Sequence, residues 1–320
     1  MEIDQLEKVE LSNAAQWILT RGKNLANPLI LHVPAGPGLP GIPEANTMKK
    51  LLQLENDFLV SYWDQRGVGK SYSKSTDAST INFNQLAEDI LACIRHLTQK
   101  YHKDKVILIG YSIGASLSLL AAQKDSSLIS RIITVGCDID LARANTYALN
   151  TALQIAKDAN RTKLVRQIEA LQNVSITTSD LFQQRAQIIT NLGGIKAGSK
   201  FSDLLRDTIT NMLFSKAYSL GDILKTIKGM EFSQNALLPE LDTFNLFHCV
   251  SKIDIPIHFI QGKLDMIAPT DAAIEYYNFI SAPEKSFKLF EHSAHMAQYE
   301  EPVKFRKLIF QYALGAHIKA

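Results

Sequence analysis

The stretch KVILIGYSIGASLSLLAAQK, residues 105–124, constrains the fold more than any other part of this 320-residue chain. Its apolar start predicts a buried strand, which leads directly into Gly110-Tyr-Ser112-Ile-Gly114 and then into a helical pattern. Glycines on both sides of the serine let a strand and a helix approach where a Cβ would clash, and the strained turn exposes the hydroxyl. We therefore predict that Ser112 is a nucleophile. The N–H of Ile113, at the positive end of the helix, is then free to stabilise an oxyanion.

Other short apolar runs predict a sheet built around this element. We expect its strands at 16–20, 28–33, 58–63, 105–110, 131–136, 255–262 and 286–290. Helical periodicity separates them, for example at 83–102, and a closing helix is expected at 297–315. Strands that alternate with helices predict an α/β fold, with a mostly parallel central sheet covered by helices on both faces.

One connection is much too long for a simple crossover between neighbouring strands. About 118 residues separate position 136 from position 255, where one helix usually suffices. This segment is rich in Gln, Asn, Thr and Lys, and its apolar residues fall on helical faces: Leu164, Ile168 and Leu171 on one, and Leu205, Ile209, Met212 and Leu213 on another. The sequence predicts a helical lid at residues 140–240, inserted into a core domain formed by residues 1–139 and 241–320.

A serine nucleophile needs a base to accept its proton and a carboxylate to orient that base. In a fold of this kind these partners follow in the chain order serine, acid, histidine. Asp265 comes three residues after Gly262, at the end of its predicted strand. His292 and His295 follow the last predicted strand, and spacing alone does not separate them. Asp138, at the end of the 131–136 strand, is the competing acid.

The loop HVPAGPGLPG, residues 32–41, can present bare backbone N–H groups to a negative charge. That charge could be a phosphate or a transient oxyanion. The loop follows the strand next to the one that ends at Ser112, which favours the oxyanion. Its prolines have no N–H to donate, so Ala35 or Gly36 is the expected second donor beside Ile113.

The segment DQRGVGKS, residues 64–71, is similar to the end of a phosphate-binding P-loop. That motif requires a glycine where this chain has Asp64, and no helical pattern follows it. We interpret Asp64 and Arg66 as residues that brace a glycine turn.

Composition suggests neither a nucleic-acid partner nor a membrane partner. The chain has 34 Lys and Arg against 32 Asp and Glu, with no long run of one sign, so neither nucleic acid nor a membrane surface is an expected partner. Three widely spaced cysteines and an acidic N-terminus without an apolar signal segment predict a cytoplasmic protein. No metal-ligand cluster is visible, and we expect neither a metal nor a cofactor. The oligomeric state is left open.

Four motifs in order resemble the α/β-hydrolase superfamily, and in particular its proline iminopeptidase-like branch. They are PAGPG at 34–38, DQRGVGKS at 64–71, GYSIG at 110–114 and HMAQYEEP at 295–302; the family has a histidine where this chain has Pro34. The resemblance selects His295 over His292 and matches Asp265 to the family's acid. It also implies acidic lid residues that hold a substrate amine, for which Glu169 and Glu231 are the candidates, among lid carboxylates that include Asp180 and Glu240.

The prediction is a serine hydrolase with the triad Ser112, His295 and Asp265. It would cleave an ester or amide of a small molecule or short peptide, as an aminopeptidase related to proline iminopeptidases. The alternatives are a carboxylesterase of the same fold and a non-catalytic protein that binds a small ligand. Epoxide or haloalkane hydrolysis would need an aspartate where Ser112 stands.

Overall fold

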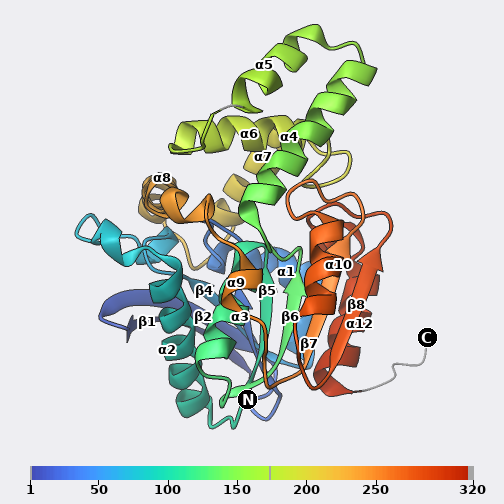
Figure 1. Ribbon diagram of the computed structural model, residues 1–320. Coiled ribbons are helices and arrows are strands. Elements are labelled where there is room, and N and C mark those ends of the chain that lie inside the picture. The colour runs from blue at the N-terminus through green and yellow to red at the C-terminus, as the bar shows by residue number, and fades with distance from the viewer. Residues whose placement is uncertain (1, 173, 316–320) are drawn as a thin grey trace.

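The computed structural model describes residues 2–172 and 174–315 (Figure 1). Eight strands of this part form one sheet in the order β1-β2-β4-β3-β5-β6-β7-β8. Pairing is antiparallel for β1 with β2 and for β2 with β4, and parallel for the other neighbours, which confirms the mostly parallel sheet. The strands are β1 (Ile3–Leu11), β2 (Ala14–Gly22), β3 (Leu29–Val33), β4 (Leu59–Asp64), β5 (Val106–Tyr111), β6 (Ile129–Val135), β7 (Ile257–Gly262) and β8 (Lys285–Phe290).

Alternating side chains of the central strands form two separate cores, one on each face of the sheet. On β5, Val106 and Leu108 face one core and Ile107 and Ile109 face the other, as the two-residue period of a strand requires. The first core also contains side chains of α2 (Phe83–Tyr101), α3 (Ile113–Lys124), α9 (Leu246–Cys249) and α10 (Thr270–Phe279). The second contains side chains of α1 (Ala45–Leu52), α11 (Ala297–Glu300) and α12 (Pro302–Leu314). Helices therefore cover both faces.

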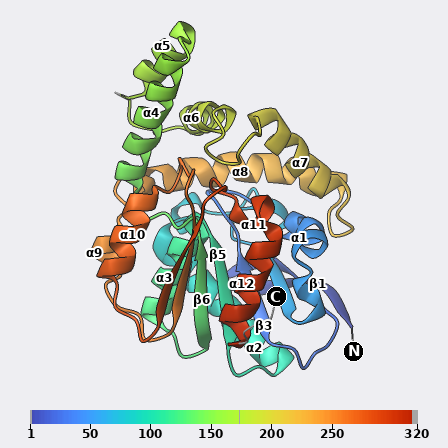
Figure 2. The ribbon, with the colours of Figure 1, turned by 90° about the vertical axis from the view of Figure 1, so that its right-hand side faces the viewer.

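A group of helices follows β6 and precedes β7 in the chain. These cap helices are α4 (Leu141–Asp158), α5 (Thr162–Gln172), α6 (Ser179–Asn191), α7 (Phe201–Leu213) and α8 (Leu220–Leu241). In Figure 1 they lie above one end of the sheet, over the ends of its strands, and in Figure 2 α8 runs across these strand ends. The domain boundaries at 140 and 240 stay a prediction.

The cap helices contain a small core of their own. Ala148, Leu149, Ile168 and Ile189 are buried in it, and they pack with Met266, which comes from the loop after β7. On α7 the expected apolar face packs only in part, because Met212 is buried whereas Leu205, Ile209 and Leu213 are exposed.

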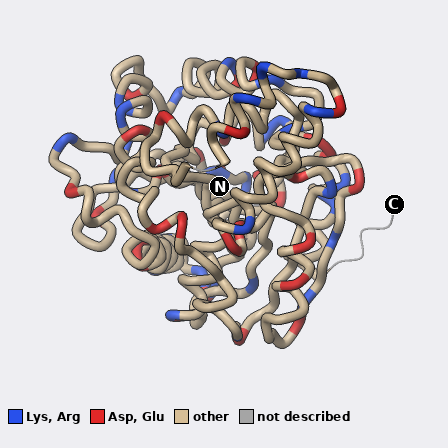
Figure 3. Tube along the Cα trace, turned by 45° about the horizontal axis from the view of Figure 1, so that its top comes forward, with Lys and Arg blue, Asp and Glu red and all other residues tan. Residues whose placement is uncertain are grey.

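Acidic and basic residues are interspersed along the chain trace (Figure 3). Within the described residues, no helix combines the length and the apolar character that crossing a membrane requires.

Candidate active site

Ser112 stands between the end of β5 and the first residue of α3, in a backbone conformation that side chains rarely adopt. Its φ is 54° and its ψ is −126°, which is a strained conformation for a residue with a Cβ. A Cβ on Gly110 would lie 2.6 Å from the Cα of Ala115, and one on Gly114 would lie 2.6 Å from the carbonyl oxygen of Val33. The tight approach predicted for the two flanking glycines is therefore confirmed.

Asp265 and His295 lie on the loops that follow β7 and β8, and they form a hydrogen-bonded pair in which the Asp265 carboxylate is buried and the His295 ring is 11% exposed. His295 Nδ1 is 2.7 Å from Asp265 Oδ2. The other carboxylate oxygen accepts the backbone N–H groups of Ile267 and Ala268, at 2.7 and 2.9 Å. Gln261 donates to Oδ2 at 3.1 Å. These donors fix the carboxylate, and the carboxylate in turn fixes the orientation of the imidazole. The second histidine of this segment, His292, is exposed.

Opposing effects act on the pKa of His295. Burial alone would lower it, but the carboxylates of Asp265 and Asp138 outweigh burial and raise it above its ordinary value. Gly136, at the end of β6, makes the close packing of this ring possible. It has a φ of +55°, and a Cβ there would lie 2.8 Å from His295 Nδ1. Sequence reasoning did not identify this glycine, whose only signal was its place at the end of a predicted strand.

Asp138, the competing acid of the sequence analysis, contacts the serine directly. The Ser112 hydroxyl donates to its Oδ2 at 3.0 Å. Its Oδ1 is buried and has no hydrogen-bond partner in the described part of the chain. Burial raises the pKa of Asp138 to about 6 from 3.8, although nearby His295 and the Ser112 hydroxyl favour the charged form. Asp138 therefore accepts the hydrogen bond of the Ser112 hydroxyl, whereas Asp265 binds the His295 imidazole.

The loop after β3 lies against the start of α3, as expected for an oxyanion-binding loop. A Cβ on Gly36 would lie 2.9 Å from the Cγ2 of Ile113, and the Gly36–Pro37 peptide bond is cis. In the described residues, the backbone N–H groups of Ala35, Gly36 and Ile113 donate no hydrogen bond to the protein. These are the three groups that the sequence selected as candidate donors.

The loop between α6 and α7 contacts the two loops that carry Asp265 and His295. The carbonyl of Gly194 accepts the N–H of Met266 at 3.1 Å, and the carbonyl of Ile195 accepts the N–H of His295 at 3.0 Å. Glu300 bridges the same region, since it accepts the N–H groups of Ala197 and Ala294. The cap helices are thereby connected to the backbone that carries the acid and the histidine.

Arg185 on α6 is a further charged residue near this site, and no sequence motif pointed to it. Its side chain is buried, and its Nε has no hydrogen-bond partner in the described residues. Burial lowers the pKa of Arg185 to about 10, while the charge of Asp138 acts in the opposite direction. The guanidinium therefore stays cationic at neutral pH.

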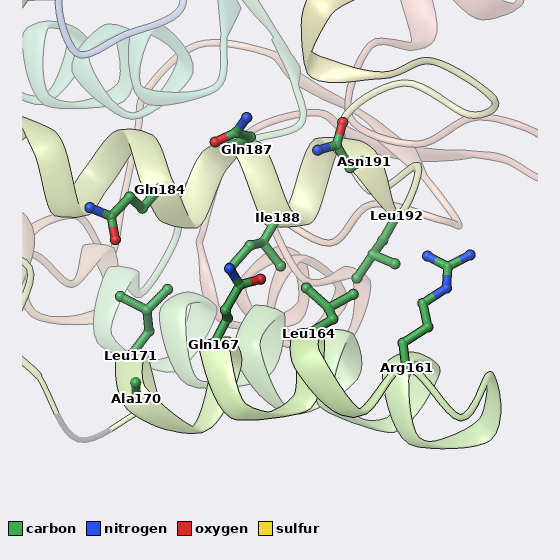
Figure 4. A pocket seen from close by; sticks show the side chains of 10 residues that line it. All are labelled: Arg161, Leu164, Gln167, Ala170, Leu171, Gln184, Gln187, Ile188, Asn191 and Leu192. Atoms are coloured by element: carbon green, nitrogen blue, oxygen red, sulfur yellow. The ribbon is translucent and has the colours of Figure 1, made fainter.

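The two predicted lid carboxylates take no visible part in the site. Glu169 on α5 and Glu231 on α8 are exposed, and neither has a hydrogen bond or ion pair with any residue described above. Their substrate-binding role stays a prediction without a supporting contact. A hollow of about 610 Å³ lies between α5 and α6 (Figure 4). It is lined by residues such as Leu164, Gln184 and Ile188, and Ser112 is not among them.

The DQRGVGKS segment forms the bracing interactions that its interpretation as a turn requires. Asp64 accepts the backbone N–H groups of Ile42 and Lys70, each at 3.0 Å. Arg66 binds Asp89 through two nitrogens, at 2.7 and 2.8 Å, and both side chains are buried. The segment is part of the scaffold.

Comparison with known proteins finds relatives and a solved structure that match most of this chain. A relative in Bacillus subtilis (strain 168), named "Probable aminopeptidase YbaC", is 28% identical over 96% of both chains. A "Proline iminopeptidase" of Heyndrickxia coagulans is 24% identical over 88% of both chains. The crystal structure of the proline iminopeptidase of Mycobacterium smegmatis matches with a TM-score of 0.68 at 18% identity, over 96% of this chain and 97% of that one.

The family described as "alpha/beta hydrolase fold" matches residues 28–302. This match covers the sheet from β3 onwards, the cap helices, and every residue of the site described above. The chain belongs to the α/β-hydrolase family, and it is a hydrolase.

Proposed function

We propose that the protein is a serine hydrolase in which Ser112 is the nucleophile, His295 the general base and Asp265 the residue that orients His295. One observation carries the proposal: a serine held at a strained strand-to-helix turn lies in the same buried site as a hydrogen-bonded histidine and aspartate pair. A hydroxyl is a weak nucleophile until a base accepts its proton, and this is the arrangement that supplies such a base.

The reaction then runs in two halves. Ser112 Oγ attacks the carbonyl carbon while its proton passes to His295 Nε2, and Asp265 stabilises the imidazolium through Nδ1. The N–H groups of Ile113 and of Ala35 or Gly36 bind the oxyanion. His295 returns the proton to the leaving group, and the acyl-enzyme forms. Water, deprotonated by His295, releases the acid and restores Ser112.

For the substrate we propose an amide with a free amine, as in an aminopeptidase. The support is that the two relatives covering most of the chain are named as an aminopeptidase and as a proline iminopeptidase. The sequence alone also left open an esterase and a non-catalytic binding protein.

A turnover screen tests these possibilities. Amino acid 4-nitroanilides, including those of proline, alanine and leucine, would be compared with 4-nitrophenyl esters of increasing chain length. We expect turnover of the anilides, loss of all turnover in Ser112→Ala, and unchanged turnover in the control Ser127→Ala, which alters an exposed serine beyond the end of α3. Turnover of esters alone would support an esterase. Activity that survives in Ser112→Ala would refute the proposed nucleophile.

A further inference from the structure

The Asp138 carboxylate is the group that the proposed mechanism does not use, although it is the group that holds the nucleophile. Ser112 must present its hydroxyl to His295, yet the hydroxyl donates to Asp138 Oδ2 at 3.0 Å. The second oxygen, Oδ1, is buried and unpartnered, and the residue is only 3% exposed. A buried carboxylate without full hydrogen bonding destabilises the folded protein. A ligand that donates hydrogen bonds to it, beside the nucleophile, would remove this penalty.

Nearby charged groups do not satisfy this carboxylate. Asp265 is committed to His295 and to two backbone N–H groups. Arg185 is close enough to favour the charged form of Asp138, but Arg185 Nε and Asp138 Oδ1 both lack a hydrogen-bond partner in the described structure. Among the described residues, His295 Nδ1 binds Asp265, and no Lys, Arg or His nitrogen forms an ion pair with the Asp138 carboxylate.

We propose that Asp138 binds the ammonium group of a substrate whose free amine lies one carbon from the scissile carbonyl, and that this binding releases the Ser112 hydroxyl to His295. The inference rests on the proposed function, and it names the residue that recognises the amine. It moves this role from the exposed lid carboxylates Glu169 and Glu231 to a carboxylate at the end of β6.

Bond geometry supports the reach. A nitrogen one carbon from a carbonyl lies about 2.5 Å from the carbonyl carbon. That carbon approaches the serine oxygen to about 3 Å before attack. These lengths allow such a nitrogen to reach hydrogen-bonding distance of the Asp138 oxygen that now lies 3.0 Å from Ser112 Oγ.

The substrate would thus assemble the base and the nucleophile. Its ammonium donates N–H bonds to Asp138 and stays protonated throughout. The Ser112 hydroxyl, displaced from Oδ2, turns to His295 Nε2. Pairing of Asp138 also removes a negative charge that raises the pKa of His295, which favours the neutral imidazole that can accept the proton. Without the amine, Asp138 competes with His295 for the Ser112 hydroxyl, and the serine reacts more slowly.

Matched anilides test this assignment. Each pair shares an acyl skeleton and a leaving group, and differs only in the amine: alanine against propionic acid, leucine against 4-methylpentanoic acid, and proline against cyclopentanecarboxylic acid, all as 4-nitroanilides. For the preferred pair we expect the wild type to favour the amine by about 10- to 100-fold in kcat/KM, the effect of a hydrogen bond to a charged group. Asp138→Asn should reduce this ratio to below about threefold, through slower turnover of the substrate that carries the amine. Asp104→Asn, which changes an exposed carboxylate before β5, should keep the wild-type ratio.

Labelling with an uncharged alkyl fluorophosphonate shows whether Ser112 is a nucleophile independently of whether Asp138 binds an amine. Absence of labelling at Ser112 would refute the serine hydrolase itself. If Ser112 is labelled, the labelling rate of the wild type should fall more with an amino acid amide (alaninamide, leucinamide or prolinamide) than with the matching amine-free amide. This difference between the two amides should vanish in Asp138→Asn. Asp138→Ala, which frees the hydroxyl, should be labelled faster than the wild type, whereas a merely structural role would slow it. Equal protection by both amides, or an amine preference that survives in folded Asp138→Asn and Asp138→Ala, would overturn the assignment.

Discussion

Replacement of Asp138 by asparagine removes a charge that the folded protein buries, and its effect on stability depends on pH. Burial raises the pKa of Asp138 from 3.8 to about 6. The folded chain therefore binds this proton more tightly than the unfolded chain does. A carboxyl whose pKa is raised by folding lowers the free energy of unfolding as pH rises from about 4 through 6. Asparagine does not titrate, so the variant should lack this loss.

The size of the effect follows from the two pKa values. Each tenfold change in an acid dissociation constant is worth ~1.4 kcal/mol, which gives about 3 kcal/mol for the full difference. About 2 to 3 kcal/mol of this should develop between pH 4 and pH 7. Any cost of burying the asparagine amide is independent of pH, and it cancels when the variant's advantage at one pH is compared with that at another.

Urea unfolding at several pH values, followed by the fluorescence of the two tryptophans, of which Trp63 is fully buried, measures this difference. We expect the free energy of unfolding of Asp138→Asn, relative to the wild type, to rise by about 2 to 3 kcal/mol from pH 4 to pH 7. Parallel curves for the two proteins would refute the reasoning, because they would mean that Asp138 ionises as easily in the folded chain as in the unfolded one.

Three more predictions concern the site and its scaffold. In the pH profile of kcat/KM, the midpoint of the acidic limb should lie above pH 6.5, because the reaction requires neutral His295 and the pKa of His295 is raised. Asp138→Asn should move this midpoint to lower pH, and an unchanged midpoint would contradict the reasoning. Gly136→Ala should slow fluorophosphonate labelling by about 10- to 100-fold, because the new Cβ would lie 2.8 Å from His295 Nδ1; wild-type rates would contradict it. Arg66→Ala should lower the free energy of unfolding by about 3–5 kcal/mol, since it leaves Asp89 buried without its partner; a urea midpoint near that of the wild type would argue against it.

The central strands were predictable because their apolar runs are continuous, which is what a strand buried on both faces requires. The expected strand at 105–110 is β5 (Val106–Tyr111), and that at 255–262 is β7 (Ile257–Gly262). The N-terminal strand β1 (Ile3–Leu11) was not predicted. It lies at the sheet edge, where only one of its nine residues is buried, so polar and apolar residues are mixed along it and form no apolar run.

Sequence motifs located the turn that carries Ser112 and the segment that carries the candidate histidines, but not the contacts between them. The glycines around Ser112 indicated a tight turn, and the structure contains that turn. Spacing did not separate His295 from His292, but the resemblance selected His295, and the structure pairs this histidine with Asp265.

Residues that approach the site from distant segments had no local signal. Arg185 lies on a cap helix whose pattern predicts only a helix, and its burial depends on how α6 packs. Asp138 was visible as a carboxylate at a strand end, but its hydrogen bond to Ser112 depends on the parallel pairing of β5 with β6.

Peptide mapping of the fluorophosphonate adduct tests the central claim, that Ser112 is the nucleophile, most directly. The wild-type protein and Ser112→Ala would be incubated with the probe, digested and analysed by mass spectrometry. The account predicts one probe per chain, on the peptide that contains Ser112, and no adduct in the variant. An adduct on another residue, or an unlabelled wild-type chain that is fully folded, would contradict it.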